Sequence, residues 1–257
     1  MLFKKIVSIL LAVLMVLGVC VTGIASAEAE LPFTDVKKNW SYKSIKYVYE
    51  AGLMNGTGDG STFSPSDSLT RAMVVTVLYR LEGSPEADYD SFLFADVPGG
   101  KFYSLAVMWA KEAGIVTSTG TDDSGMELFS PMRAITRQEL ATMFVRFAQY
   151  RYVITEEKAD LSAFKDVADV AKWAKDAMGW CNGEGLIKGT GTGDTLSPKN
   201  TATRAEFATI MHRFIEADFD YEYVYKSPKV LSTYTEKEYP LVTNADVYVA
   251  VDGNDKR

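Results

Sequence analysis

The feature that most constrains this 257-residue chain is an internal repeat. Five short landmarks recur three times in the same order, and each copy opens with an F-x-D-V motif at residues 33–36, 94–97 and 164–167. Chance does not readily produce five ordered landmarks three times. A repeat architecture therefore takes precedence over any other interpretation of the chain.

The other four landmarks follow at matching places in each copy. An aromatic residue stands twelve positions before a glycine, an A-G-[LI]-like segment contains that glycine, a loop closes on Ser-Pro, and a Thr-Arg pair begins an apolar periodic segment. The aromatic residues are Trp40, Phe102 and Trp173; the glycines are Gly52, Gly114 and Gly185; the Thr-Arg pairs begin at Thr70, Thr136 and Thr203.

The first half of each copy predicts a helix. In residues 40–51 the apolar positions Trp40, Ile45, Val48 and Tyr49 have helical spacing. Gly52 and its counterparts suit the left-handed conformation that ends a helix. Cys181 aligns with Val48 and Ala110, so we expect it to be a small core residue.

The second helix of each copy is expected to begin at the threonine. Residues 136–139 and 203–206 form S/T-x-x-E capping boxes, whereas Met73 takes the glutamate position in the first copy and leaves half a box. Apolar stripes follow in the second and third copies. They comprise Leu140, Met143, Phe144 and Phe147, and Phe207, Ile210, Met211 and Phe214.

The arginine after each threonine is the main candidate for binding. Arg71, Arg137 and Arg204 stand in the first turn of a helix, where the dipole disfavours a cation. The recurrence of arginine at this position in all three copies therefore indicates a functional role. Together with free N–H groups at a helix start they would form an anion site. The alternative is an ion pair with the F-x-D aspartates, and both roles can coexist.

These landmarks resemble the S-layer homology family, with its F-x-D-V, aromatic, A-G-[LI], loop and T-R-A-E pattern, over roughly residues 32–215. The resemblance implies a mainly α fold of three helix–loop–helix repeats in a pseudo-threefold arrangement, with short strand-like loop segments and grooves between neighbours. The expected division is a signal peptide (1–27), repeats at 32–85, 93–150 and 163–216, a linker (217–244) and a possible first strand of a passenger domain (245–257).

The resemblance also implies a function. Members of this family bind secondary cell-wall polysaccharides that often carry pyruvate ketals, so the chain is expected to be a noncovalent wall anchor and not itself an enzyme, with no cofactor and no metal. Arginines would hold the carboxylate, aspartates would bond sugar hydroxyls and aromatic residues would stack on sugars. Packing at the head of a helix is the alternative for the aromatics and is preferred for Phe102. The implied carbohydrate-binding residues are Asp35, Trp40, Arg71, Asp96, Arg137, Asp166, Trp173, Arg204, Gly58, Gly120 and Gly191.

Differences between the copies indicate unequal grooves. Gly58, Gly120 and Gly191 align and are expected at turns, whereas Gly56 and Gly189 align with Ser118. The third copy keeps T-R-A-E and the glycines best, so the largest contribution to binding is expected from Arg204. A phosphate loop, a calcium loop and a nucleophile motif are not supported, and the lone His212 is expected at the surface or a boundary.

The first 27 residues predict a secretory signal. Lys4 and Lys5 precede an apolar run that closes on Ala25-Ser26-Ala27. An uncleaved anchor, or a lipoprotein signal at Cys20, is the less favoured alternative. Cleavage would leave one cysteine and 25 basic against 34 acidic residues. We therefore expect no intramolecular disulfide, no nucleic-acid partner and no membrane partner.

The tail predicts a passenger. Val247, Val249 and Val251 alternate before a D-G-N-D turn, which resembles the opening of right-handed parallel β-helix domains. The sequence is therefore expected to be a piece of a longer surface protein. The alternatives to a simple anchor are an S-layer subunit that self-associates into a lattice and the anchor of a carbohydrate-active β-helix enzyme.

Overall fold

The computed structural model describes residues 30–86 and 94–220. The expected signal peptide, the expected strand at 245–257 and most of the expected linker lie outside these residues. Within the described ranges, no helix is long and apolar enough to cross a membrane. The described residues from Leu31 onward belong to one compact unit, to which all that follows refers.

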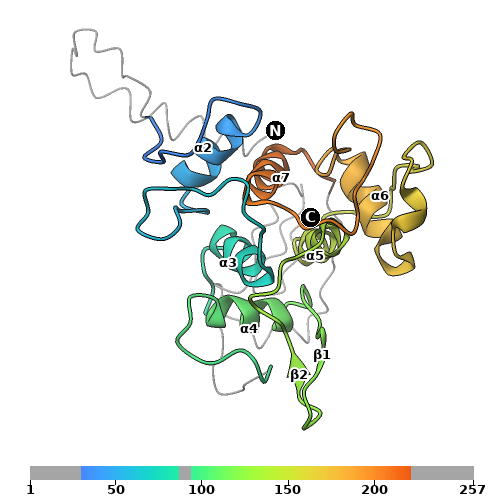
Figure 1. Cartoon of the computed structure of the whole chain (residues 1–257). Helices are drawn as coiled ribbons and strands as arrows, with labels where there is room; N and C mark the ends of the chain where they lie inside the picture. Colours follow the sequence, from blue (N-terminus) through green and yellow to red (C-terminus); the bar gives the residue numbers. More distant parts are fainter. Residues whose placement is uncertain (1–29, 87–93, 221–257) are drawn as a thin grey trace, which may run out of the picture. The chain divides into compact units, whose positions relative to one another are not determined.

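Each repeat contains two helices joined by a long loop (Figure 1). Repeat one has α2 (Tyr42–Glu50) and α3 (Arg71–Leu81). Repeat two has α4 (Ser104–Glu112), the hairpin β1 (Gly120–Thr121) and β2 (Glu127–Leu128), and α5 (Arg137–Tyr150). Repeat three has the 3-10 turns η1 (Val167–Asp169) and η2 (Lys172–Ala174), then α6 (Lys175–Gly183) and α7 (Arg204–Glu216). The expected mainly α, helix–loop–helix fold is confirmed.

The helix ends follow the sequence signals. Gly52, Gly114 and Gly185 have φ values of 70°, 70° and 67°, which is the left-handed conformation that closes a helix without a Cβ penalty. Thr136 and Thr203 form complete capping boxes with Glu139 and Glu206. Thr70 accepts only from the N–H of Met73, so the half box is also confirmed.

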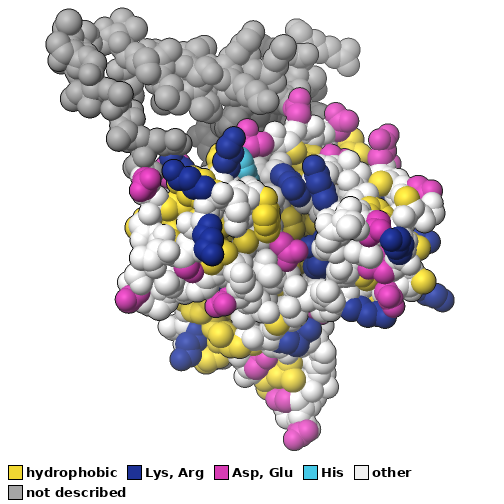
Figure 2. All heavy atoms as spheres, turned by 45° about the horizontal axis from the view of Figure 1, so that its top comes forward, with side chains coloured by type: hydrophobic (Ala, Val, Ile, Leu, Met, Phe, Trp, Pro, Cys, Tyr) yellow, Lys and Arg dark blue, Asp and Glu magenta, His cyan; other side chains and the backbone are white. Residues whose placement is uncertain are grey.

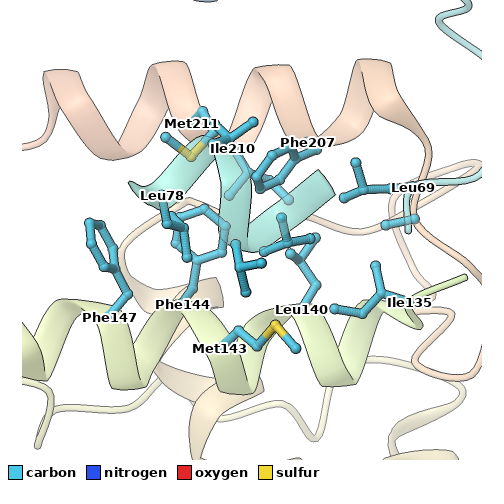
Figure 3. Packing of buried hydrophobic residues seen from close by; sticks show 14 of the residues in the cluster. Leu69, Leu78, Ile135, Leu140, Met143, Phe144, Phe147, Phe207, Ile210 and Met211 are labelled. Atoms are coloured by element: carbon cyan, nitrogen blue, oxygen red, sulfur yellow. The ribbon is translucent and has the colours of Figure 1, made fainter. Parts of the chain in front are cut away.

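The second helices of the three repeats form the centre of the core. Leu140, Phe144 and Phe147 of α5 point toward α7 and α3, where Phe207 and Leu78 lie (Figure 3). Met143 of α5 and Ile210 and Met211 of α7 belong to the same buried cluster. All of these side chains are buried, as are Phe214 and Cys181. The predicted core stripes and the buried position of the cysteine are therefore confirmed.

The first helices pack around this centre in a cyclic order. Helix α4 of repeat two contacts α3 of repeat one, α6 of repeat three contacts α5 of repeat two, and α2 of repeat one contacts α7 of repeat three. Each first helix thus covers the second helix of the preceding repeat. The last contact joins the ends of the repeat array, so the three repeats close into a ring.

Three backbone hydrogen bonds close the same ring at its axis. The N–H of Leu69 donates to the carbonyl of Ala202 (2.8 Å), Ala202 donates to Ile135 (3.0 Å), and Ile135 donates to Leu69 (2.9 Å). The three residues are buried and immediately precede the threonine caps. Because buried peptide groups need partners, this triangle fixes the starts of α3, α5 and α7 relative to one another.

The loop of repeat two differs for a steric reason. A Cβ atom on Gly189 would lie 2.1 Å from the carbonyl oxygen of Gly193, and one on Gly56 would lie 2.6 Å from that of Gly60. Only glycine fits these tight loops. In repeat two the longer loop pairs β1 with β2 instead (Figure 1), and Ser118 stands at the corresponding place.

Candidate functional site

The three repeated arginines reach out of their own repeat. The Nε of Arg71 in repeat one donates to the carbonyl of Phe129 in repeat two (2.8 Å), and its Nη2 donates to Thr117 (3.2 Å). Its guanidinium also lies over the Phe129 ring at 4.6 Å. Arg71 therefore links repeat one to repeat two, and its side chain is almost fully buried.

The other two arginines repeat this geometry around the ring. Arg137 donates from Nε to Leu196 (2.9 Å) and from Nη2 to Lys188 (2.9 Å) in repeat three. Arg204 donates from Nε to Phe63 (2.7 Å) and from Nη2 to Asn55 (2.8 Å) in repeat one. Each arginine thus serves the loop of the next repeat and not its own.

The helix starts are not free anion sites, and this part of the sequence argument is wrong. The N–H of Arg71 donates to the carbonyl of Arg133 (3.0 Å), that of Ala72 to Pro131 (2.9 Å), and that of Met73 to the Thr70 hydroxyl. The corresponding N–H groups of α5 and α7 are occupied in the same way. The neighbouring repeat supplies the acceptors that a ligand would otherwise provide.

The F-x-D aspartates hold the Ser-Pro corner of each loop. Asp35 accepts from the N–H groups of Phe63 (2.8 Å) and Ser64 (2.7 Å). Asp96 and Asp166 bind the matching pairs in their own repeats at 2.7–2.8 Å. Within the described ranges, none of these carboxylates is ion-paired with a repeated arginine. Instead, Asp35 binds the N–H of Phe63 while Arg204 binds the carbonyl of the same residue.

Burial lowers the pKa values of the three arginines. It lowers the pKa of Arg71 to about 10, with the nearby Arg133 acting in the same direction and Glu139 and Asp96 opposing it. Burial also lowers the pKa of Arg137 and Arg204, against the opposing effect of Glu206 on Arg137 and of Asp67 on Arg204. All three guanidinium groups therefore remain charged at neutral pH.

A hydroxyl pair recurs in every loop. Its Oγ atoms are 2.7 Å apart in Thr57–Ser64, 2.8 Å in Thr119–Ser130 and 2.7 Å in Thr190–Ser197. The three serines have φ values of 51–56°, an uncommon conformation for a residue with a side chain. Sequence reasoning did not single out these threonines, although their alignment at one repeat position is the signal that would have found them.

The three repeated aromatic residues are exposed. Trp40, Phe102 and Trp173 have exposed fractions of 65%, 61% and 59%. The expectation that Phe102 packs at the head of its helix is wrong, because most of its ring faces solvent and it touches Tyr103 only edge-on. Trp40 is likewise not a core position of its helix, which begins two residues later.

A surface cavity of about 430 Å³ brings several of these groups together. Its lining includes Trp40 from repeat one, Arg137 from repeat two, and Thr190, Ser197 and Glu206 from repeat three. Arg137 also donates to Glu206 at 2.7 Å. Sequence-predicted residues from different repeats therefore meet in one groove, to which every repeat contributes; we call it the Arg137 groove.

The cyclic contacts place the equivalent residues at two corresponding sites between repeats, which we call the Arg71 groove and the Arg204 groove by analogy. In the Arg71 groove, Arg71 lies against the loop of repeat two, and the segment carrying Trp173 adjoins the start of α5, where the N–H of Ala171 donates to Gln138 (2.9 Å). In the Arg204 groove, Arg204 lies against the loop of repeat one and α4, which follows Phe102, packs on α3.

The three predicted loop glycines have positive φ values. Gly58 and Gly191 have φ values of 57° and 58°, and Gly120 has 152°. A Cβ atom on any of them would meet no heavy atom within 4 Å, so conformation and not crowding explains the glycine. The turn interpretation is confirmed for Gly58 and Gly191, whereas Gly120 lies in β1. None of the three glycines lines the Arg137 groove.

Other candidate chemistry is sparse in the part of the chain that the structure describes. No group of three His, Cys, Asp or Glu side chains there could hold a metal ion. His212 is partly buried, stacks on Tyr47 with ring centroids 4.2 Å apart, and has Nδ1 3.1 Å from the Ser44 hydroxyl. Its expected boundary position is confirmed. On the face shown in Figure 2, basic and acidic side chains are interspersed.

The ring of three helix–loop–helix repeats with inter-repeat grooves defines the class of the protein. The S-layer homology domain profile matches residues 32–72, 93–141 and 163–208, which together make up more than half of the chain. The chain therefore belongs to the S-layer homology domain family. This membership indicates a secreted protein of the cell surface that is associated with the cell wall, as the sequence predicted.

Similar proteins fall into two groups. The chain is 30% identical to an endoglucanase of Bacillus sp. (strain KSM-635) over 89% of its own length and 24% of that protein. It is 29% identical to Exoglucanase XynX of Acetivibrio thermocellus, over 72% of this chain and 16% of the relative. It is 30% identical to the S-layer protein sap of Bacillus anthracis, over 80% and 24%. The chain thus spans a quarter or less of these relatives.

Proposed function

We propose that residues 32–216 attach a surface protein noncovalently to the bacterial cell wall by binding an anionic secondary cell-wall polysaccharide in the inter-repeat grooves. The observation that carries this proposal is the threefold recurrence of one set of groups. An exposed aromatic ring, a buried arginine and a Thr–Ser hydroxyl pair recur in all three repeats. In the Arg137 groove the three repeats bring one of each together.

The chemistry of these groups fits a sugar. Exposed aromatic rings offer apolar faces on which the C–H faces of a sugar ring can stack, and paired hydroxyls can exchange hydrogen bonds with sugar hydroxyls. The Arg137 groove, at about 430 Å³, has the size of typical small-molecule sites, which range over roughly 300–1,000 Å³. A guanidinium group adds a partner for a carboxylate.

The net charge of the chain makes local contacts decisive. The chain carries a formal charge of −7, so an anionic polymer is repelled at long range. Binding must then rely on short, directional interactions with individual arginines. Aspartates 35, 96 and 166 support binding indirectly in this proposal, because their carboxylates already hold the loops on which the hydroxyl pairs stand.

A sedimentation assay with cell-wall sacculi tests the proposal. The parent should sediment with sacculi that retain their polysaccharide and stay in solution with stripped peptidoglycan. Trp40→Ala and Trp173→Ala should weaken binding without loss of stability, because both side chains are largely exposed. Met126→Ala, an exposed residue in the β1–β2 hairpin, is the matched control. Equal sedimentation with stripped peptidoglycan would contradict a polysaccharide ligand.

The arginines provide a second test. Arg71→Ala, Arg137→Ala and Arg204→Ala should each weaken binding, and Arg204→Lys should not restore it, because lysine cannot span two acceptors as a planar fork does. Each variant needs a check of its fold, since these arginines also tie the repeats together. Folded variants that all bind like the parent would leave the arginines with a structural role alone.

A further inference from the structure

The three grooves carry different charges, and we propose that this difference sorts the sugar residues of the polymer. The Arg71 groove selects a residue bearing a carboxylate, whereas the Arg137 groove takes an uncharged residue. This inference rests on the proposed function and adds to it which groove recognises which chemistry. It follows from the residues at two repeat positions, which lie beside the arginine in each groove.

The first position is the residue whose carbonyl accepts the backbone N–H of the arginine. It is Arg133 for Arg71 (3.0 Å), Asn200 for Arg137 (2.9 Å) and Asp67 for Arg204 (3.0 Å). One backbone contact thus places a positive, a neutral and a negative side chain at equivalent sites. Asn200 lines the Arg137 cavity directly, so this position belongs to the groove surface.

The second position is the third residue of the helix that borders the groove. Glu206 there pairs with Arg137, whose side chain is only 6% exposed, at 2.7 Å. In the Arg71 groove the matching Glu139 is bound by Arg133 instead, with Nη2 and Oε1 2.5 Å apart. In the Arg204 groove the matching residue is Met73, which carries no charge.

The sum of the charges around the arginine therefore differs between the grooves. Arg71 with Arg133, Arg146, Glu139 and Asp96 leaves one positive charge. Arg137 with Glu206 and Asp166 leaves one negative charge, and so does Arg204 with Asp67 and Asp35. The Arg71 groove is thus the one of the three with an uncompensated cation, which favours an anionic ligand group at short range. A carboxylate entering the Arg137 groove would have to compete with Glu206 for its guanidinium.

Two of the grooves contain their own spectroscopic reporter. Trp173 belongs to the Arg71 groove and Trp40 to the Arg137 groove, and both rings are exposed. The chain has four tryptophans, and the other two, Trp109 and Trp180, are buried. Indole N–H signals in a ¹⁵N–¹H NMR spectrum of the full chain, assigned with Trp40→Phe and Trp173→Phe, therefore report the two grooves separately.

The test is a titration with two probes, an anionic hyaluronan tetrasaccharide and the neutral chitin tetrasaccharide. With the anionic probe, the Trp173 signal should shift at a concentration about two- to fivefold lower than the Trp40 signal, as expected for one partly exposed charge. The neutral probe should show no such preference. Added salt should weaken the Trp173 response to the anionic probe selectively.

Two charge variants sharpen the test. Arg133→Asn should weaken the preference of the anionic probe for Trp173. Glu206→Gln should strengthen the response of Trp40, and it keeps the capping box because glutamine serves at that position. An anionic probe that perturbs Trp40 first, or both signals equally, would overturn the assignment, and so would no response to either probe from a chain that still binds sacculi. Failure to bind sacculi at all would overturn the proposed function instead.

Discussion

Arg204 in repeat three lies against Met73 in repeat one, with its Nη1 atom 4.0 Å from the methionine sulfur. The T-R-A-E motif of repeat three directed the expectation of the largest binding effect to Arg204, because that motif is intact. That expectation stays a prediction, but in the structure the motif does not serve Arg204 alone. Glu206 of the same motif pairs with Arg137 of repeat two, so one motif contributes to two different grooves.

Met73→Glu should stabilise the fold. The substitution completes the capping box at Thr70 and places a carboxylate beside Arg204, which together should raise the free energy of unfolding by up to about 1 kcal/mol. Urea denaturation measures the change. Met73→Gln completes the box without the charge, so it should lie between the parent and Met73→Glu. A Glu variant less stable than the Gln variant would contradict the predicted ion pair.

Asp166→Asn should destabilise the loop of repeat three. Both carboxylate oxygens of Asp166 accept backbone N–H groups at 2.7 Å, and asparagine offers only one acceptor. The expected loss is about 1.5–3 kcal/mol in the free energy of unfolding. Asp169→Asn, which removes an exposed ion pair with Lys199, should cost less than about 1 kcal/mol. Equal losses in the two variants would assign Asp166 no special structural role.

Cys181 should resist thiol reagents in the folded protein. The side chain is fully buried, its Sγ lies 3.7 Å from the carbonyl of Ala141, and burial raises the pKa of the thiol. Little thiolate is then available to react. Labelling with a coloured disulfide reagent should be slow at neutral pH and fast in denaturant. Labelling of the native protein at the denatured rate would show that the core opens readily at α6.

Because of Glu82, the free energy of unfolding should fall as the pH rises above about 4.5. Burial raises the pKa of this carboxyl, against the opposing effect of Arg151, and its Oε1 has no hydrogen-bond partner. A raised pKa means that the folded state binds more protons than the unfolded state, so stability is greatest below the unfolded pKa and is lost as pH rises through the folded one.

Glu82→Gln tests that sign, because glutamine resembles the protonated carboxyl. The variant should match the parent in urea denaturation at pH 4 and exceed it at pH 7. A parent that is the more stable protein at pH 7 would show that the ion pair with Arg151 outweighs the burial of the charge.

Short-range signals made the repeats and helix ends predictable. Threonine caps, left-handed glycines and apolar stripes act within about one helical turn, so the residues that form them lie close in the sequence. The sequence accordingly predicted the capping boxes at Thr136 and Thr203, the φ of Gly52 and the burial of Cys181. It also identified the three arginines as equivalent.

Only the tertiary structure decided which neighbours those equivalent residues face. Arg71 and Arg137 bind carbonyls 58 and 59 residues away, and Arg204 binds one 141 residues away across the closure of the ring. The repeated sequence does not reveal that each arginine binds the loop of the next repeat, because that depends on how the helices pack in a ring. For the same reason the expectation of free helix starts was wrong, because the neighbouring repeat supplies the carbonyl groups that occupy their N–H groups.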